Sequence, residues 1–203
     1  MKATVFGEGV NNADYVTQKF ETYIVDGKKK QRLIWICPYY QTWYSMLRRC
    51  YSSVLHKNRP TYIGCSVVPE WKVFMTFRKW MMNQDWEDMV LDKDILFKRN
   101  KVYGPETCVF VTQETNSFTN EHGRVRGDCP LGVCWHKRDE VYTATVNDGS
   151  GKIIHLGYHN NPITAHKAWL KKKLELAKVL ALKQNDNRVA EALVLRYDVE
   201  IYE

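Results

Sequence analysis

The sequence predicts an α+β fold, because helical and strand patterns occupy different parts of the chain. Apolar residues recur at helical spacing twice before residue 82. Alternating polar and apolar residues then mark three short strands between residues 132 and 157, and a further helical pattern covers 162–176. Three closely spaced strands followed by one helix indicate a small antiparallel sheet that packs on that helix.

The composition favours a globular protein with an acidic partner. The chain has 203 residues, enough for one domain or two small ones, and its 44% hydrophobic content excludes a disordered chain. Thirty Lys and Arg against 23 Asp and Glu give a net charge of +7, which favours nucleic acid as a partner. No apolar run reaches the ~18 residues of a membrane helix, and no signal-type segment follows Met1, so we expect no membrane association.

The positive charge is concentrated in the second half of the chain. Residues 122–183 contain eleven Lys and Arg against five Asp and Glu, whereas residues 184–203 contain two against five. The basic stretch includes the predicted sheet and its helix. We therefore expect a polyanion to bind there, and the tail that follows is acidic.

The cysteines indicate reduced thiols. They include no CxxC pair and no secretory signal precedes them, so disulfides are not expected. A zinc site is not expected either, because the spacings match no standard zinc motif. The six cysteines are Cys37, Cys50, Cys65, Cys108, Cys129 and Cys134.

The N-terminal segment, 1–40, contains the pattern of a β-hairpin. Strands over 20–25 and 32–36 flank the pair Asp26-Gly27, which favours a tight hairpin turn. Three lysines, Lys28–Lys30, follow the turn. They form either a solvated loop or a phosphate contact.

Two core-facing helices are predicted between residues 41 and 81, with a short extended piece, 62–67, between them. The second helix begins near Pro69 and carries an aromatic stripe from Trp71 to Met81, a pattern far more typical of a core than of a binding platform. The first, 41–53, has apolar residues at i, i+3, i+4, i+7 and i+8: Trp43, Met46, Leu47, Cys50 and Tyr51.

The next segment predicts two strands and a helix with metal-binding side chains. The strands are 90–96 and 108–111, and the helix, 112–120, has Thr112 as its N-cap. Two aspartates, Asp92 and Asp94, would point to the same side of the first strand, and two asparagines, Asn116 and Asn120, would share one helix face. Carboxylates and amides in this arrangement can hold a divalent cation against a phosphate.

The order of these motifs resembles the HNH-type endonuclease-like proteins of bacteriophages over about residues 43–120. The residues that carry the resemblance are MLRRCYSS, PTYIGCSVVPEWKVFMTFRKWM, LDKDI and NKVYGPETCVFVTQETN. The resemblance implies an HNH-like ββα-metal domain over 41–121 and a protein of the host cytoplasm. It also implies that Asp92, Asp94, Asn116 and Asn120 are catalytic, with Mg²⁺ or Mn²⁺ on Asp92, Asp94 and Asn116.

The sequence departs from this family at two positions. The general-base His has no counterpart in Leu91–Asp94, and the Asn of the family's P-E-N-C motif is Thr107, although Glu106 is kept. One alternative is an endonuclease or nickase that uses a water, an aspartate, or an imidazole from His56 or His122 as the base. The others are an inactive DNA-binding regulator or accessory protein on the same scaffold, and a phage inhibitor of a host factor.

The three strands near the C-terminus, 132–137, 141–147 and 152–157, have two distinct faces. The apolar face, which the helix 162–176 would cover, consists of Val133, Trp135, Tyr142, Ala144, Val146, Ile154 and Leu156. The free face consists of Cys134, His136, Thr143, Thr145, Asn147, Ile153 and His155. This face either meets water or binds a ligand.

This module resembles the plant ethylene-response-factor type of DNA-binding domain, the Apetala-two fold. The resemblance spans about 127–178 and rests on Arg126-Gly127, Gly132-Val133, Tyr142-x-Ala144, Gly151-Lys152, His155-Leu156-Gly157 and Ala165-His166-x-Ala168. It implies a domain over 131–178 whose sheet enters the major groove of double-stranded DNA. The implied DNA contacts are Arg126, His136, Lys137, Arg138, Thr143, Thr145, Asn147, Lys152 and His155, with Cys134 and Ile153 on the same face.

Two flanking segments complete the predicted organisation. A basic, glycine-containing linker, 122–130, precedes the C-terminal module. An amphipathic helical tail, 179–203, follows it and is broken at 185–187. The lysines Lys171–Lys173 form either a solvated face or a phosphate patch, and the acidic tail either packs back on the body or forms a homodimer.

Overall fold

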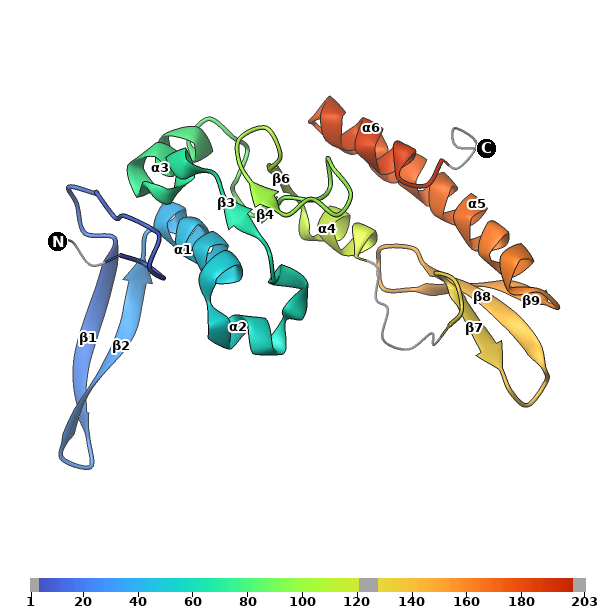
Figure 1. Ribbon diagram of the computed structural model, residues 1–203, viewed down its shortest axis with the longest axis horizontal. Coiled ribbons are helices and arrows are strands. Elements are labelled where there is room, and N and C mark those ends of the chain that lie inside the picture. The colour runs from blue at the N-terminus through green and yellow to red at the C-terminus, as the bar shows by residue number, and fades with distance from the viewer. Residues whose placement is uncertain (1–3, 121–127, 199–203) are drawn as a thin grey trace. The chain divides into compact units, whose positions relative to one another are not determined.

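The computed structural model describes residues 4–120 and 128–198, which form two compact units with mixed α and β structure (Figure 1). The first unit comprises the described residues of 1–87 and 99–110. The second comprises those of 88–98 and 111–203. The predicted α+β class is therefore confirmed, and the short segment 88–98 belongs with the C-terminal half of the chain.

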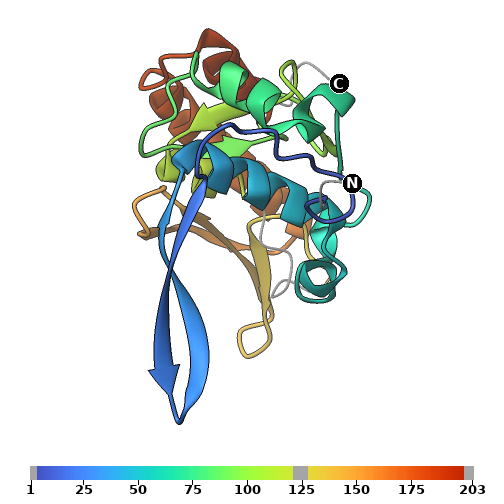
Figure 2. The same cartoon turned by 90° about the vertical axis from the view of Figure 1, so that its left-hand side faces the viewer.

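The predicted hairpin is present in the first unit. Strands β1 (Gln18–Val25) and β2 (Lys28–Ile36) pair antiparallel and extend away from helix α1 (Pro38–Tyr51), as Figure 2 shows. The turn residues Asp26 and Gly27 have φ angles of 51° and 71°. A two-residue turn of type I′ requires positive φ at both positions, so this pair closes the hairpin as predicted.

The core of the first unit lies between α1 and α3 (Phe74–Met81), and it is largely aromatic. The indole of Trp43, which is fully buried, donates a hydrogen bond of 2.7 Å to the backbone carbonyl of Trp71 and so ties α1 to the segment before α3. The prediction of one continuous helix from Pro69 to Met81 was wrong. A 3₁₀ turn, η2 (Pro69–Lys72), comes first, and extended backbone at Val73 separates it from α3.

Short elements complete this unit. They are α2 (Ser53–Asn58), the 3₁₀ turn η1 (Pro60–Tyr62), β3 (Ser66–Val67), β5 (Val102–Tyr103) and β6 (Val109–Val111), whose last residue falls in the second unit. Ser52 caps α2 by accepting the Leu55 N–H. The extended piece predicted over 62–67 is reduced to β3, which pairs in parallel with β5.

The second unit contains the predicted three-stranded sheet on one helix. Strands β7 (Val133–His136), β8 (Val141–Asn147) and β9 (Ile153–His159) are antiparallel in the order β7-β8-β9. Helix α5 (Pro162–Ala181) lies across one face, where Val133, Ala144 and Ala165 form a buried cluster (Figure 1). Alanine at the contact allows the helix to approach the sheet closely.

Trp135 departs from the predicted apolar face. Its side chain is 44% exposed, whereas Val133, two residues earlier, is 2% exposed. The Trp135 ring packs on Tyr142 of the neighbouring strand, with centroids 4.7 Å apart. It therefore lies at the margin of the sheet instead of under α5.

The C-terminal helices pack back on helix α4 (Gln113–Thr119), which is one of the two predicted alternatives. Helix α6 (Asn187–Leu195) is preceded by Asp186, whose carboxylate caps it by accepting the Arg188 N–H, so the predicted break near 185–187 is present. The ring of Tyr197 meets that of Phe118 edge-on at 5.8 Å. Lys183 forms an ion pair with Glu114 at 3.2 Å.

Lys173 is a further correction, because it belongs to neither a solvated face nor a phosphate patch. Its side chain is 7% exposed, and its ammonium donates a hydrogen bond of 2.8 Å to the Phe118 carbonyl near the C-terminal end of α4. The ammonium also lies 3.4 Å from the Phe118 ring centroid. A cation at a helix C-terminus and above an aromatic ring is favourable on both counts, so Lys173 joins α4 to α5.

Candidate DNA-binding face and carboxylate pair

The face of the β7–β9 sheet opposite α5 carries the predicted DNA contacts. Cys134, Asn147 and His155 are exposed, and His136, Thr143 and Thr145 are half-buried. The strand register places Cys134 opposite Thr143, and Thr145 opposite His155. The sheet therefore brings these side chains together on one surface, as the alternation predicted.

Several of these side chains already make local hydrogen bonds. The Thr143 hydroxyl donates to the Cys134 carbonyl at 3.2 Å, and Asn147 Oδ1 accepts the Gly149 N–H at 2.8 Å. Nδ1 of His155 accepts the Gly157 N–H at 3.2 Å, so its Nε2 carries the proton in the neutral ring. These bonds orient the side chains, and the donors of the two side chains are then His155 Nε2–H and the Asn147 amide NH₂.

The cations of this sheet lie at its ends and are balanced by acids. Lys137 and Lys152 are exposed, and Arg138 bonds Asp139 at 2.7 Å, which holds the pKa of that carboxyl below its usual range. Three bases between residues 131 and 159, Lys137, Arg138 and Lys152, face three acids, Asp139, Glu140 and Asp148. This surface is therefore rich in hydrogen-bonding groups without being strongly basic. The predicted contact Arg126 lies outside the described residues.

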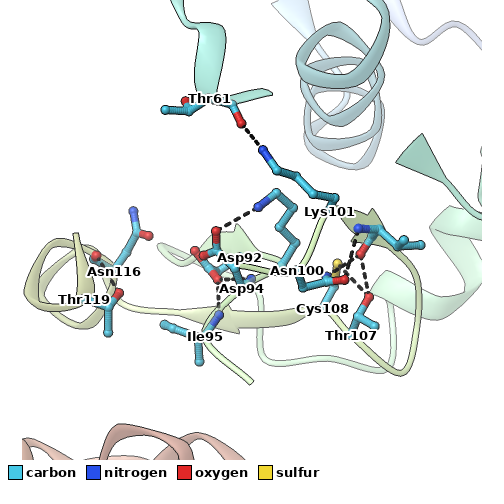
Figure 3. Close-up of polar contacts among 12 residues, drawn as sticks. Thr61, Asp92, Asp94, Ile95, Asn100, Lys101, Thr107, Cys108, Asn116 and Thr119 are labelled. Carbon is cyan, nitrogen blue, oxygen red and sulfur yellow. Dashed lines mark hydrogen bonds and ion pairs between the residues drawn. The ribbon is translucent and has the colours of Figure 1, made fainter. Parts of the chain in front are cut away.

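The second candidate site is the pair Asp92 and Asp94, both in the second unit (Figure 3). Strand β4 (Val90–Asp92) ends at Asp92, because Oδ1 of that residue accepts the N–H groups of Asp94 and Ile95, each at 2.8 Å. The prediction of a strand over 90–96 was wrong for this reason. Asp94 lies in the turn after the strand, and the turn brings it beside Asp92.

The surroundings of this pair raise the pKa of Asp92 and place cations beside Asp94. Burial raises the pKa of the Asp92 carboxyl, and the nearby Asp94 charge raises it further, against the lowering effect of the two backbone N–H groups. Lys93 is 7% exposed and its ammonium lies 2.8 Å from Asp94 Oδ2. The Arg196 guanidinium donates to the Asp94 carbonyl from the end of α6. Asp94 is thus held by two cations that the sequence pattern did not indicate.

The other residues of the predicted site are two asparagines, Asn116 and Asn120, and the motif residues Glu106 and Thr107. Asn116 lies on α4, as predicted, and Figure 3 shows it on the helix near the two aspartates. Asn120 has extended backbone (φ −69°, ψ 117°) at the C-cap, so the predicted helix face shared with Asn116 is not formed. Glu106 is exposed in the first unit. Thr107 closes a local turn by donating to the Val102 carbonyl at 2.8 Å.

The donor set fits a hard divalent cation in part. Asp92 Oδ2, the Asp94 carboxylate and the Asn116 amide are oxygen donors of the type that Mg²⁺ or Mn²⁺ accepts, and Mg²⁺ commonly takes one or two carboxylates with waters and phosphates. The Lys93 ammonium competes for Asp94. Across residues 4–120 and 128–198, no three His, Cys, Asp or Glu side chains are arranged to hold a metal ion.

A general-base histidine beside this pair stays a prediction. His56 lies in the first unit, where its ring bonds the Arg49 carbonyl at 2.9 Å. The segment 88–98 and helix α4 contain no histidine, and His122 lies outside the described residues. The remaining histidines are on β7, β9 and α5: His136, His155, His159 and His166.

Comparisons with known proteins do not identify a family for the chain. No family model, no curated protein and no solved structure matches the chain. Of the helices in the described part of the chain, none has the length and apolar character needed to cross a bilayer. All six cysteines lie among the described residues, where none of them forms a disulfide, and Cys134 is the exposed one.

Proposed function

We propose that the protein binds double-stranded DNA with the exposed face of the β7–β9 sheet. The observation that carries this proposal is the asymmetry of the sheet: α5 buries one face, and the other presents hydrogen-bonding side chains from all three strands. The resemblance to the Apetala-two fold points to the same face.

The chemistry of the face suits base edges more than phosphates. Imidazole, hydroxyl and amide groups on His155, Thr145 and Asn147 can donate to and accept from bases in the major groove. Lys137 and Lys152 lie at the ends of the strands, where they would contact phosphates and orient the sheet. Ile153, which is 69% exposed, would meet a thymine methyl group. Protection of the Cys134 thiol by duplex DNA, described in the Discussion, tests this proposal.

A second candidate function is metal-dependent cleavage of a DNA strand at the Asp92 pair, as in the HNH-like endonuclease scaffold. The observation that favours it is a desolvated carboxylate beside a second carboxylate. Asp92, Asp94 and Asn116 would hold Mg²⁺ or Mn²⁺, which would stabilise charge on the phosphate. The alternative is an inactive scaffold that acts as a DNA-bound regulator or accessory protein.

Asp92→Asn should stabilise the metal-free protein at pH 7 by about 1 kcal/mol. The Asn Oδ1 can still accept the Asp94 and Ile95 N–H groups, and the desolvated charge next to Asp94 is removed. Because the folded-state pKa of Asp92 is raised above its usual 3.8, its ionised form opposes folding. The gain should shrink as the pH falls through the raised pKa and vanish below the unfolded value. Urea unfolding between pH 4 and pH 8 measures it.

Magnesium titration of both proteins then separates the two roles of the pair. If the pair holds a metal, 10 mM Mg²⁺ or Mn²⁺ raises the melting temperature of the wild type and leaves Asp92→Asn unchanged. Supercoiled plasmid would be nicked by the wild type with metal and not by the variant. Equal metal responses would contradict a metal site at Asp92. A variant less stable than the wild type at pH 7 would contradict the destabilising effect of the Asp92 charge.

A further inference from the structure

We propose that the β1–β2 hairpin is a second DNA-binding element, which places one basic face against duplex DNA. The two strands form a sheet of their own, and Figure 2 shows the ribbon projecting from the rest of the first unit. An isolated two-stranded hairpin is only marginally stable in water, so a ribbon of eight and nine residues per strand gains stability from a partner.

The strand register sorts the hairpin into two unlike faces. The basic face consists of Lys19, Glu21, Tyr23, Val25, Lys28, Lys30, Arg32 and Trp35. The apolar face consists of Phe20, Thr22, Ile24, Lys29, Gln31 and Leu33. Four cations and one acid lie on the basic face, whereas the apolar face carries one cation. The lysines that follow the turn are therefore split between the faces.

Cations alternate with aromatic rings on the basic face. The Lys19 ammonium lies 5.5 Å from the Trp35 ring centroid, and the Arg32 guanidinium lies 5.9 Å from that of Tyr23. Arg32 also pairs with Glu21 at 2.6 Å. Long cationic side chains held beside exposed rings are the combination that nucleic-acid-binding surfaces use for phosphates and bases.

Charge favours DNA over a second copy of the chain. Between residues 18 and 36, five Lys and Arg face two Asp and Glu, a net charge of +3. Two such hairpins paired in a dimer would repel each other, whereas a polyanion neutralises both the tip and the basic face. The major groove, about 12 Å wide, admits a two-stranded ribbon.

The hairpin also supplies the excess of positive charge that the C-terminal sheet lacks. Charge on the β7–β9 sheet is balanced, so its three cations support a slope of about −3 for log K against log salt, at ~0.9 per phosphate contact. The basic face of the hairpin would make the slope steeper, to about −5 or −6. This inference stands on its own residues and holds whether or not the C-terminal sheet binds DNA.

Lys30→Gln and Lys29→Gln form a matched pair for the test, because they are adjacent, both exposed, and on opposite faces. Fluorescence anisotropy of the full chain on a 30-base-pair duplex, between 50 and 200 mM salt, measures affinity and slope. Lys30→Gln should weaken binding about fourfold at 100 mM salt and make the slope shallower by ~0.9. Lys29→Gln should match the wild type in both quantities.

The other possible outcomes would overturn the hairpin proposal, the sheet proposal or both. Equal affinities and slopes for wild type, Lys29→Gln and Lys30→Gln would overturn the hairpin inference, and a dimer in light scattering would then assign the ribbon to a second copy. Lys152→Gln separates the two proposals. A loss with Lys152→Gln but not Lys30→Gln leaves the sheet alone as the DNA site, and the reverse leaves the hairpin alone. A wild type that binds no duplex at 50 mM salt would overturn both.

Discussion

Replacing Gly132 by Ala is expected to cost about 3 kcal/mol of the free energy of unfolding. A Cβ at this position would lie 1.9 Å from Trp169 Cδ1 and 2.1 Å from Trp169 Cγ, well inside any allowed contact. Trp169 is 7% exposed and stacked on His166 with centroids 5.6 Å apart, so it has little room to move. Gly132 also has φ +74°, which adds about 1 kcal/mol of backbone strain for Ala. Urea unfolding followed by tryptophan fluorescence measures the loss.

Gly151→Ala is the matched control for this change. Gly151 also has positive φ, +97°, but nothing lies within 4 Å of a Cβ built there. Its loss should therefore be the strain alone, about 1 kcal/mol. The difference between the two variants reports the contact between the first strand of the sheet and α5. Equal losses would contradict the close packing of Gly132 on Trp169.

Reversing two charges at the ends of the C-terminal sheet, with Lys137→Glu and Lys152→Glu together, should weaken duplex binding about 30-fold, or ~2 kcal/mol. Both lysines are exposed, so the variant should fold normally. The reversal removes two phosphate contacts and adds repulsion where the sheet would meet the backbone. Anisotropy on a 30-base-pair duplex at 100 mM salt measures the change.

Lys171→Glu with Lys178→Glu provides the control for this pair. These lysines are exposed on α5, the helix that covers the opposite face of the sheet, and the net charge changes equally. This variant should bind within about threefold of the wild type, because only the long-range field is altered. If both pairs lose affinity equally, the exposed sheet face is not the contact surface.

Much of the fold could be predicted because its signals are local. The Asp26-Gly27 pair encodes a two-residue turn, and both residues have the positive φ that this turn needs. The alternation of polar and apolar residues correctly predicted which side chains of the C-terminal strands face the core: Val133 and Ala144 are buried, and Cys134 is exposed. Trp135 does not follow this alternation, because its large aromatic side chain lies at the margin of the sheet and packs on Tyr142 of the neighbouring strand.

The candidate sites could be predicted less well, because their geometry depends on contacts that sequence spacing does not reveal. The Asp92 carboxylate ends its own strand by accepting two backbone N–H groups, and no periodicity indicates this. Arg196 reaches the Asp94 carbonyl from about a hundred positions away along the chain. Lys173 lies within a run of three lysines, yet it is buried against Phe118. Charge counting therefore overestimated the basic surface beside the sheet.

Cys134 is a natural reporter for the proposal that duplex DNA covers the exposed face of the β7–β9 sheet. This thiol is the exposed one of the six cysteines, and it lies on β7 opposite Thr143. Peptide mass spectrometry of the full chain can follow its alkylation by N-ethylmaleimide, with the half-buried Cys129 as an internal reference.

The measurement compares alkylation rates with and without saturating 30-base-pair duplex. We expect DNA to slow the Cys134 reaction at least tenfold and to leave the Cys129 rate within about twofold, because the sheet face loses its access to solvent. If the protein is saturated with duplex and Cys134 is still alkylated as fast as in the free chain, the exposed face of the sheet is not the DNA-binding face.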